Sequence, residues 1–263
     1  MLSLIKNFFT HKDFLPPAAE IPGTLFTPLH FIFSAFCITA VIFFAIKLSK
    51  KSEDKIRLVF AILWVTLITL EATKIIWESL SGAKINFEWR GMLPLYPCSI
   101  FMYALPFAIW GKKWVRDAAC GYVCSLGFLG GAINFVYPAN ILGRYSCISF
   151  AGFHTFFYHG SLVMCALVMI MSGYHSYTKT TSKAQLFLPS LPFLCMSIVA
   201  NVVNYSKIDS DYMFFKLESF IFAPLGAATA DWIATILVYA AYIFIHALPY
   251  IPFYIKNNRR CEA

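Results

Sequence analysis

Residues 28–47 read PLHFIFSAFCITAVIFFAIK, a stretch without Lys, Arg, Asp or Glu before its final position. A helix needs about 20 mainly apolar residues to cross a hydrocarbon core about 30 Å thick, so this stretch predicts a transmembrane helix. Further apolar stretches follow along the chain. The sequence therefore predicts an all-α, polytopic membrane protein with about seven transmembrane helices, the other six at 57–80, 92–111, 117–138, 153–174, 184–205 and 231–255.

The composition of the 263-residue chain favours the same class of protein. Hydrophobic residues make up 59% of the chain and charged residues only 13%, whereas soluble domains carry about 25% charged residues. The mean hydropathy is +0.68. Seven spans would use most of the chain, so we expect one membrane domain over residues 28–255, with short loops and no separate soluble domain.

Three segments are expected to lie outside the spans. Apolar residues recur at helical spacing within residues 1–13, which predicts a helix in the membrane interface as part of an N-terminal segment, 1–27. The apolar run 213–227 is short and contains charged residues, so we expect an interfacial or re-entrant segment there. Residues 256–263 form the expected C-terminal tail.

Positive charges in the loops predict the orientation of the chain. Thirteen Lys and Arg residues fall in loops on one side, against seven on the other. By the positive-inside rule the N-terminus is outside and the C-terminus and its tail are cytoplasmic. Topology thus explains the net charge of +8, and no nucleic-acid partner is expected. The expected partners are membrane lipids, the expected location in a bacterial cell is the plasma membrane, and the oligomeric state stays open.

Polar residues within the predicted spans gather in their outer halves. Cys98 lies roughly 9 Å below the outer end of the third span, and His159 lies at the same depth in the fifth. Ionisable groups are costly within hydrocarbon unless they are paired or line a wet cavity. One-sided clustering therefore predicts a functional site that opens to the outer leaflet, and its other members would be Glu71, Lys74, Asn134, Asn201, Asn204, Tyr205 and Asp231.

Cys98 has a sequence context that favours a reactive thiol. Pro94 and Pro97 interrupt the start of the third span. Proline is favoured at the first helical position, which would place Cys98 in the first turn. The helix dipole and the unsatisfied N–H groups there stabilise a thiolate, and a nearby imidazole would complete a nucleophile and base pair. The alternative is that Cys98 is a small buried apolar residue.

Two histidines compete as the partner of Cys98. His154 and His159 are five residues apart, so on an ideal helix they point about 140° away from each other, and helical geometry alone does not choose between them. A metal site formed by Cys98 and both histidines would need a bent helix, and no further cluster of ligand-type residues supports it. No metal and no cofactor is therefore expected.

The remaining polar residues have structural interpretations as well. Glu71 and Lys74, three residues apart, can neutralise each other within the bundle. Asn201 and Asn204 are typical of interhelical hydrogen bonds. A rival class of function is a small-solute or ion transporter, with Glu71, Lys74 and Asp231 as the binding charges. A third class is a non-catalytic lipid-binding membrane protein that uses the same cavity.

At these positions the sequence resembles a known family. The resemblance covers roughly residues 25–255 in order and spacing, and it is to the bacterial YwaF-like integral membrane proteins, which are related to the eukaryotic transmembrane protein 164 family. The motifs that carry it are Glu71-x-x-Lys74, Leu93-Pro94-Leu95-Tyr96-Pro97-Cys98-Ser99-Ile100, Gly131-Ala132 with Pro138, Phe156-Phe157-Tyr158-His159, and Asn201-x-x-Asn204-Tyr205.

The resemblance implies an enzyme of lipid metabolism. Eukaryotic members are described as acyltransferases that remodel phospholipids through a cysteine and a histidine, and they are likened to the androgen-induced-gene hydrolases of fatty-acid esters. Carried over, the cysteine falls on Cys98 and the histidine on His159. We therefore expect a membrane-embedded lipid acyltransferase or ester hydrolase that works through an acyl-thioester, with supporting or substrate-binding roles for Glu71, Lys74, Ser99, Asn134, His154, Asn201, Asn204 and Tyr205.

Overall fold

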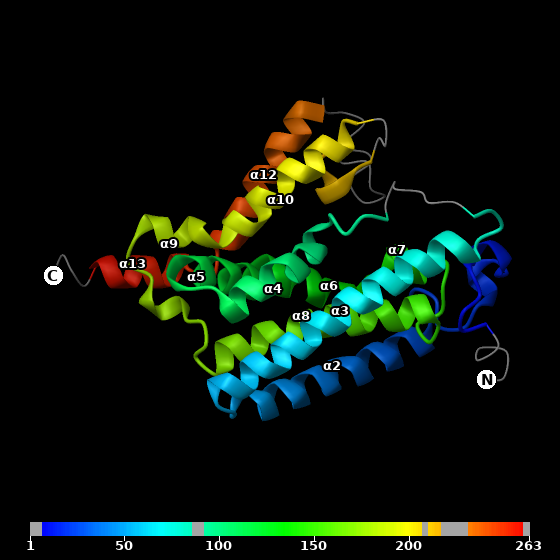
Figure 1. Cartoon of the computed structure of the whole chain (residues 1–263), viewed down its shortest axis with the longest axis horizontal. Helices are drawn as coiled ribbons and strands as arrows, with labels where there is room; N and C mark the ends of the chain where they lie inside the picture. Colours follow the sequence, from blue (N-terminus) through cyan, green and yellow to red (C-terminus); the bar gives the residue numbers. More distant parts are fainter. Residues whose placement is uncertain (1–6, 86–91, 207–209, 217–230, 260–263) are drawn as a thin grey trace. The chain divides into compact units, whose positions relative to one another are not determined.

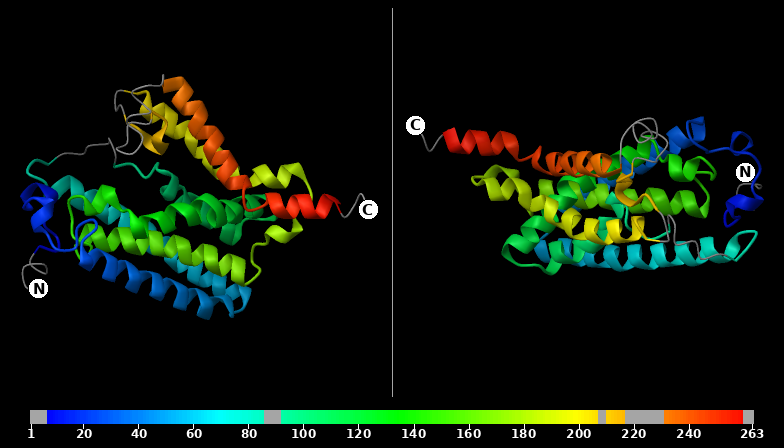
Figure 2. Two further views of the ribbon diagram at one scale, coloured as in Figure 1. Left: turned by 180° about the vertical axis from the view of Figure 1, so that it is seen from behind. Right: turned by 90° about the horizontal axis from the view of Figure 1, so that it is seen from above.

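The computed structural model describes residues 7–85, 92–206, 210–216 and 231–259. Within these ranges all regular secondary structure is helical, which confirms the all-α class (Figures 1 and 2). The chain divides into two compact units. The first unit comprises Met1–Glu88 and Phe128–Met171, and the second comprises Trp89–Gly127 and Ser172–Ala263.

The first unit is built around one central helix. This helix, α8 (Phe150–Met171), packs against α2 (Pro28–Ser49), α3 (Glu53–Ser81) and α6 (Phe128–Val136) (Figure 1). A single-turn helix, α7 (Ala139–Leu142), precedes the loop into α8. Helix α8 is therefore the element that positions polar side chains in this unit.

Close packing in the first unit depends on small and aromatic residues. Phe135, Phe156 and Val163 belong to one buried cluster that joins α6 to α8. A Cβ atom on Gly131 would lie 2.8 Å from a methyl carbon of Val163 and 3.1 Å from the His159 carbonyl oxygen, so only glycine allows this approach. On the other side, the Ser34 hydroxyl of α2 donates to the Phe135 carbonyl oxygen at 2.8 Å. Gly131 thus marks a close contact between α6 and α8.

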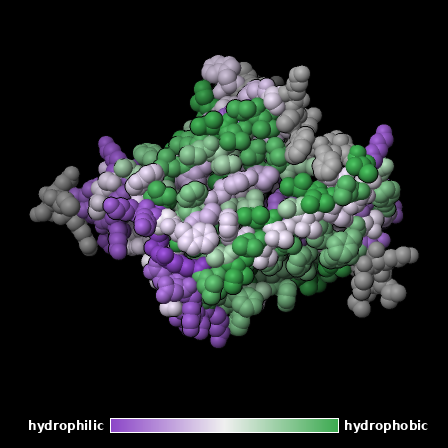
Figure 3. All heavy atoms as spheres, in the orientation of Figure 1, coloured by the Kyte–Doolittle hydropathy of each residue, from purple (hydrophilic) through white to green (hydrophobic). Residues whose placement is uncertain are grey.

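Helices α2 and α3 expose apolar side chains along most of their length. Only 17% of the most apolar window of each helix is buried. Phe36 and Phe44 on α2 and Ile62 on α3 are more than half exposed, at 69%, 57% and 57%. Hydrophobic residues accordingly cover much of the surface in Figure 3. Such helices are stable in hydrocarbon, where their backbone groups are satisfied internally and apolar side chains face lipid.

The described part of the N-terminal segment is not the interfacial helix expected over residues 1–13. Residues 7–9 form a turn, and short 3-10 helices follow at η1 (Lys12–Phe14) and η2 (Ala18–Glu20). The backbone carbonyl of Phe8 accepts from the Phe150 N–H at 2.9 Å, and that of Phe9 accepts from the Trp77 indole at 3.0 Å. These carbonyls bond to α8 and α3 instead of to the next turn of their own segment, which explains the difference.

The second unit begins with a broken helix. The 3-10 turn η3 (Pro97–Ser99) leads into α4 (Ile100–Trp110), and α5 (Lys113–Tyr122) packs against α4. Helix α5 continues into a π-helix, η4 (Val123–Gly127), which contacts η3. The later elements of this unit are η5 (Tyr177–Lys179), α9 (Lys183–Phe187), η6 (Leu188–Ser190), α10 (Leu191–Asn204), η7 (Tyr212–Phe214), α12 (Asp231–Ala247) and α13 (Ile251–Arg259).

Among the described residues, five helical stretches are long and apolar enough to cross a membrane, or six if one bent pair counts as a span. They correspond to predicted spans one, two, four, five and six. The bent pair, α12 with α13, covers the seventh and turns by 57° at its break. The third predicted span, 92–111, contains only the short helix Pro97–Trp110, because Pro94 and Pro97 delay its start. The orientation stays a prediction.

The predicted re-entrant segment at 213–227 is described only in part. Its first residues belong to η7, where Met213 has a left-handed backbone with a φ of 60°. Residues 217–227 lie outside the described ranges. Residues 7–27 of the N-terminal segment are described and precede α2, and residues 256–259, half of the expected tail, belong to α13.

Candidate functional site

Cys98 lies in the first turn of a proline-started helix, as the sequence predicts. Pro97 is the first residue of η3, and Tyr96 before it is extended, with φ −78° and ψ 159°. The Ser99 N–H donates to the Tyr96 carbonyl at 2.9 Å and closes the turn. Cys98 is half-buried. Thiols in the first turn face unsatisfied N–H groups, which favour the thiolate.

Two tyrosines of the second unit interact with the cysteine turn. The Tyr122 hydroxyl donates to the carbonyl oxygen of Pro97, the residue directly before Cys98. Tyr122 is fully buried. Tyr242 on α12 is the second tyrosine within electrostatic range of the Cys98 thiol. Sequence reasoning missed both, because a tyrosine within an apolar run does not reveal the partner of its hydroxyl.

The asparagines of α10 hold their own unit together. The Asn204 amide donates to the Tyr212 carbonyl oxygen at 2.9 Å and accepts from the Tyr212 N–H at 2.7 Å. Asn201 donates to the Tyr239 hydroxyl at 3.0 Å, and its own Oδ1 is buried without a partner in the described structure. Tyr205 is exposed and its hydroxyl lies 3.4 Å from that of Thr235. The interhelical hydrogen-bond interpretation is thus confirmed for Asn201.

In the first unit, the predicted pair of Glu71 and Lys74 is present and gains a third member. The Lys74 amine lies 3.4 Å from Glu71 Oε1. His154 Nε2 on α8 lies 2.9 Å from Glu71 Oε2. Glu71 and His154 are both buried, at 8% and 4% exposure. One carboxylate therefore joins two basic groups from two helices, and it connects α3 to α8.

His159, five residues after His154 on α8, is held in a defined tautomer. Its Nδ1 lies 2.8 Å from the Thr155 carbonyl oxygen. A carbonyl only accepts, so Nδ1 carries the hydrogen, and the lone pair of the neutral ring is on Nε2. That Nε2 atom is buried and has no hydrogen-bond partner in the described ranges. The structure thus separates the two histidines, because His154 faces Glu71 and His159 presents a bare ring nitrogen.

The predicted site residues fall in two groups, one in each unit. Glu71, Lys74 and His154 contact one another in the first unit, which also carries His159 and Asn134. The side chain of Asn134 donates to the Gly130 carbonyl oxygen of its own helix at 3.0 Å. The second unit carries the other members, Cys98, Ser99, Asn201, Asn204, Tyr205 and Asp231. The pairing of Cys98 with His159 stays a prediction.

Cys147 offers a contrast to Cys98. It lies in the loop before α8 and is fully buried. Burial, which disfavours the charged form, raises the pKa of the Cys147 thiol to about 11. This thiol is thus protonated at neutral pH and is a poor nucleophile.

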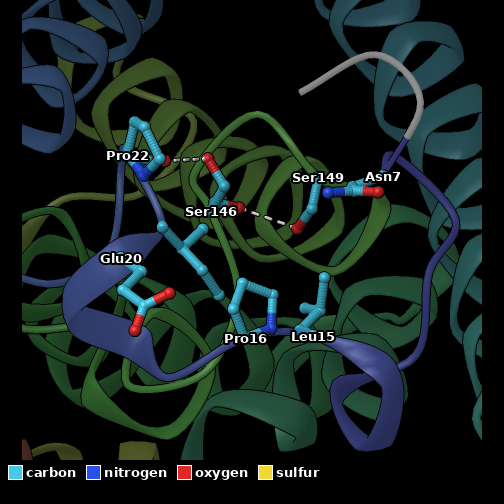
Figure 4. Close-up of a pocket in the computed structure, with 8 residues that line it drawn as sticks. Asn7, Leu15, Pro16, Glu20, Pro22, Ser146 and Ser149 are labelled. Carbon is cyan, nitrogen blue, oxygen red and sulfur yellow. Dashed lines mark hydrogen bonds between the residues drawn. The ribbon is translucent and has the colours of Figure 1, made fainter. Parts of the chain in front are cut away.

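The first unit also holds a small cavity that the sequence did not indicate. It has a volume of about 190 Å³, and its lining comes from the N-terminal segment and from the loop before α8 (Figure 4). Glu20, Ser146 and Ser149 line it, and both serine hydroxyls already donate to backbone carbonyls at 2.7 Å. None of the predicted site residues lines this cavity. Among the described residues, no group of three or more His, Cys, Asp or Glu side chains is arranged to hold a metal ion.

The apolar helices and their composition define a multi-pass integral membrane protein. A family model for the TMEM164 family matches residues 25–256, which is most of the chain. The chain therefore belongs to the TMEM164 family, in agreement with the resemblance seen in its motifs. No curated protein and no solved structure gave a significant match.

Proposed function

We propose that this protein is a membrane-embedded lipid acyltransferase or lipid ester hydrolase, with Cys98 as the nucleophile and His159 as the base. The observation that carries the proposal is the tautomer of His159. Its Nδ1 hydrogen is held by the Thr155 carbonyl, so the buried Nε2 is ready to accept a proton. The position of Cys98 in a first helical turn supports the other half of the pair.

The reaction proceeds in two steps. The Cys98 thiol gives its proton to His159 Nε2, and the thiolate attacks the carbonyl carbon of a lipid ester. Collapse of the tetrahedral intermediate breaks the ester C–O bond, and the leaving alkoxide takes the proton from the imidazolium. This leaves an acyl-thioester on Cys98 and a free lysolipid.

The second step releases the acyl group. A lysolipid hydroxyl or a water molecule gives a proton to His159 Nε2 and attacks the thioester carbonyl. The C–S bond breaks, and the Cys98 thiolate recovers the proton from the imidazolium. A lysolipid as acceptor gives acyl transfer, and water gives hydrolysis. The Asn201 amide donates one N–H to the Tyr239 hydroxyl, and its second N–H is the proposed donor to the oxyanion.

Contacts in the first unit favour this proposal over solute transport. Glu71, which the transport hypothesis uses as a binding charge, is already joined to Lys74 and His154. A carboxylate with two basic neighbours is suited to linking two helices. Asp231, the third charge of that hypothesis, is the first residue of α12. A non-catalytic lipid-binding role stays an outcome of the test below.

The test uses the full-length protein in proteoliposomes with a phospholipid that carries a labelled acyl chain. We expect acyl transfer or release by the native protein and a hydroxylamine-sensitive acyl adduct on Cys98, seen by mass spectrometry. Cys98→Ala and His159→Ala should each reduce the rate by at least about 100-fold, and the double variant should be no slower than either single variant. Cys195→Ala, which changes an exposed cysteine of α10, is the matched control.

Two results would refute the proposal. The first is full acyl transfer by the Cys98→Ala protein. The second is lipid binding by native protein without any turnover or acyl adduct, which would favour the non-catalytic role. Uptake of a solute that needs Glu71 and Lys74 but not Cys98 would favour the transporter instead.

A further inference from the structure

Two sets of hydrogen bonds in the second unit meet at adjacent backbone positions, Gly121 and Tyr122, and the second set ends at the residue before Cys98. His246 Nδ1 on α12 lies 2.7 Å from the Ser125 hydroxyl oxygen in the π-helix η4. Ser125 donates to the Gly121 carbonyl oxygen at 2.6 Å, one residue before Tyr122. The Tyr122 hydroxyl then donates to the Pro97 carbonyl oxygen. None of these three side chains is part of the proposed reaction.

We propose that Tyr122 is a positioning residue for Cys98, and that His246 acts on the same turn through Ser125. The inference rests on the proposed function only in treating Cys98 as the reactive thiol. In this inference, Tyr122, Ser125 and His246 hold the turn Pro97–Ser99 in the geometry that favours the Cys98 thiolate.

The direction of each hydrogen bond follows from the groups involved. The Ser125 hydroxyl hydrogen is used on the Gly121 carbonyl, so its oxygen accepts from His246 Nδ1–H. His246 is fully buried, and its ring lies 5.1 Å from that of Tyr122 between centroids. The His246 ring therefore packs against the Tyr122 ring at a tilt of 40°, and its Nδ1–H holds the preceding backbone through Ser125.

The backbone around Tyr122 is irregular and closely packed. A π-helix is rare, usually a single turn within an α-helix, and it frequently occurs at functional sites. Here it follows directly after Tyr122, and a Cβ atom on the preceding Gly121 would lie 2.5 Å from the Tyr250 hydroxyl and 2.7 Å from Pro189. Close packing on one side and Ser125 on the other thus hold the backbone that carries Tyr122.

The consequence for Cys98 comes from the position of the Pro97 carbonyl. Pro97 has no N–H, and its ring fixes φ, so its carbonyl is the group through which the turn can be held from outside. Loss of the Tyr122 hydroxyl would release the Pro97–Cys98 peptide. The thiol would then lose its fixed relation to the N–H groups of the first turn, which are the groups that favour the thiolate.

The experiment measures Cys98 reactivity and does not depend on catalysis. Full-length protein in lipid nanodiscs is alkylated with iodoacetamide over a series of pH values, and mass spectrometry follows the Cys98 peptide. In Tyr122→Phe, which removes one oxygen atom, the pH of half-maximal alkylation should rise by about half a unit or more. Cys195, which is exposed on α10, is the internal reference for folding and should react unchanged.

Tyr174→Phe is the matched control. Tyr174 belongs to the same unit, and its hydroxyl also donates to a backbone carbonyl of α4, that of Ala108, at 2.8 Å. This variant should leave the alkylation profile of Cys98 unchanged. A Tyr122→Phe profile identical to that of Tyr174→Phe would overturn the inference.

Two substitutions at His246 test its hydrogen bond to Ser125. Asparagine places an amide N–H near the position of Nδ1 and keeps a donor for Ser125, whereas leucine removes it. We expect His246→Leu to shift the Cys98 profile in the same direction as Tyr122→Phe, and His246→Asn to restore it. Equal shifts in both variants would instead assign the effect to the loss of the imidazole ring beside Tyr122 and refute the role through Ser125.

These outcomes separate the inference from the proposed function. A shifted Cys98 profile in Tyr122→Phe, in a protein without any acyl transfer, would support the positioning role and refute the enzyme. Acyl transfer by native protein together with an unshifted Tyr122→Phe profile would support the enzyme and refute the positioning role.

Discussion

At the scale of single residues, the ion pair of the first unit shows where sequence reasoning succeeds and where it stops. The spacing of Glu71 and Lys74 predicts their contact, because residues three apart share a helix face. The third member, His154, comes from another helix, and no local pattern specifies which of the two α8 histidines meets Glu71. The tautomer of His159 was likewise unpredictable, since it depends on one hydrogen bond to a backbone carbonyl.

Glu71→Gln should be the more damaging of two substitutions in this pair. It removes the carboxylate that neutralises Lys74 and contacts His154, and breaking a buried pair in this way costs about 3 kcal/mol. Lys74→Met leaves Glu71 with His154 and should cost less. The double variant should be less destabilised than the sum of the two, because the partners are coupled. Thermal unfolding in detergent micelles measures all three, and additive losses would contradict the coupling.

At the scale of helices, hydropathy predicted where apolar segments lie but not how they break. Helix α2 begins at Pro28, as predicted, because Thr27 caps the His30 N–H and proline suits the first position. Residues 92–111 are apolar enough to be predicted as a span, yet the helix begins only at Pro97. Hydropathy summed over about 20 residues does not take into account that Pro94 and Pro97 lack a backbone N–H, so it does not predict where the helix begins.

The contact between α6 and α8 gives a paired test at this scale. In Gly131→Ala the new methyl group would lie 2.8 Å from Val163, and overpacking of this kind costs about 1–3 kcal/mol. Gly130→Ala is the matched control, because a Cβ atom there meets nothing within 4 Å. It should be neutral or stabilising by up to about 1 kcal/mol, since alanine favours helix. Equal melting temperatures for the two variants would contradict this packing.

At the scale of the whole molecule, family membership and fold class agree with the sequence, whereas orientation rests on charge counting. A cysteine introduced at Lys50, which follows α2, should be protected from membrane-impermeant maleimide in intact cells, and one at Arg144 should be labelled. Both positions are exposed, so access depends on the side of the membrane. Labelling in the opposite pattern would invert the orientation and place the cysteine turn towards the cytoplasm.

The contacts of the N-terminal segment determine the order in which it docks while the chain is being synthesised. The Lys12 N–H donates to the Tyr145 hydroxyl across 133 residues of sequence, and Phe8 bonds to Phe150, at the start of α8. At about 5–20 residues per second, a ribosome needs on the order of ten seconds to make the residues between them. Until then Phe8 and Lys12 lack these two partners, although Trp77 of α3, which bonds to the Phe9 carbonyl, is made much earlier. The contact with α3 can therefore form first, and the bonds to Tyr145 and Phe150 complete the docking of the segment once α8 is made.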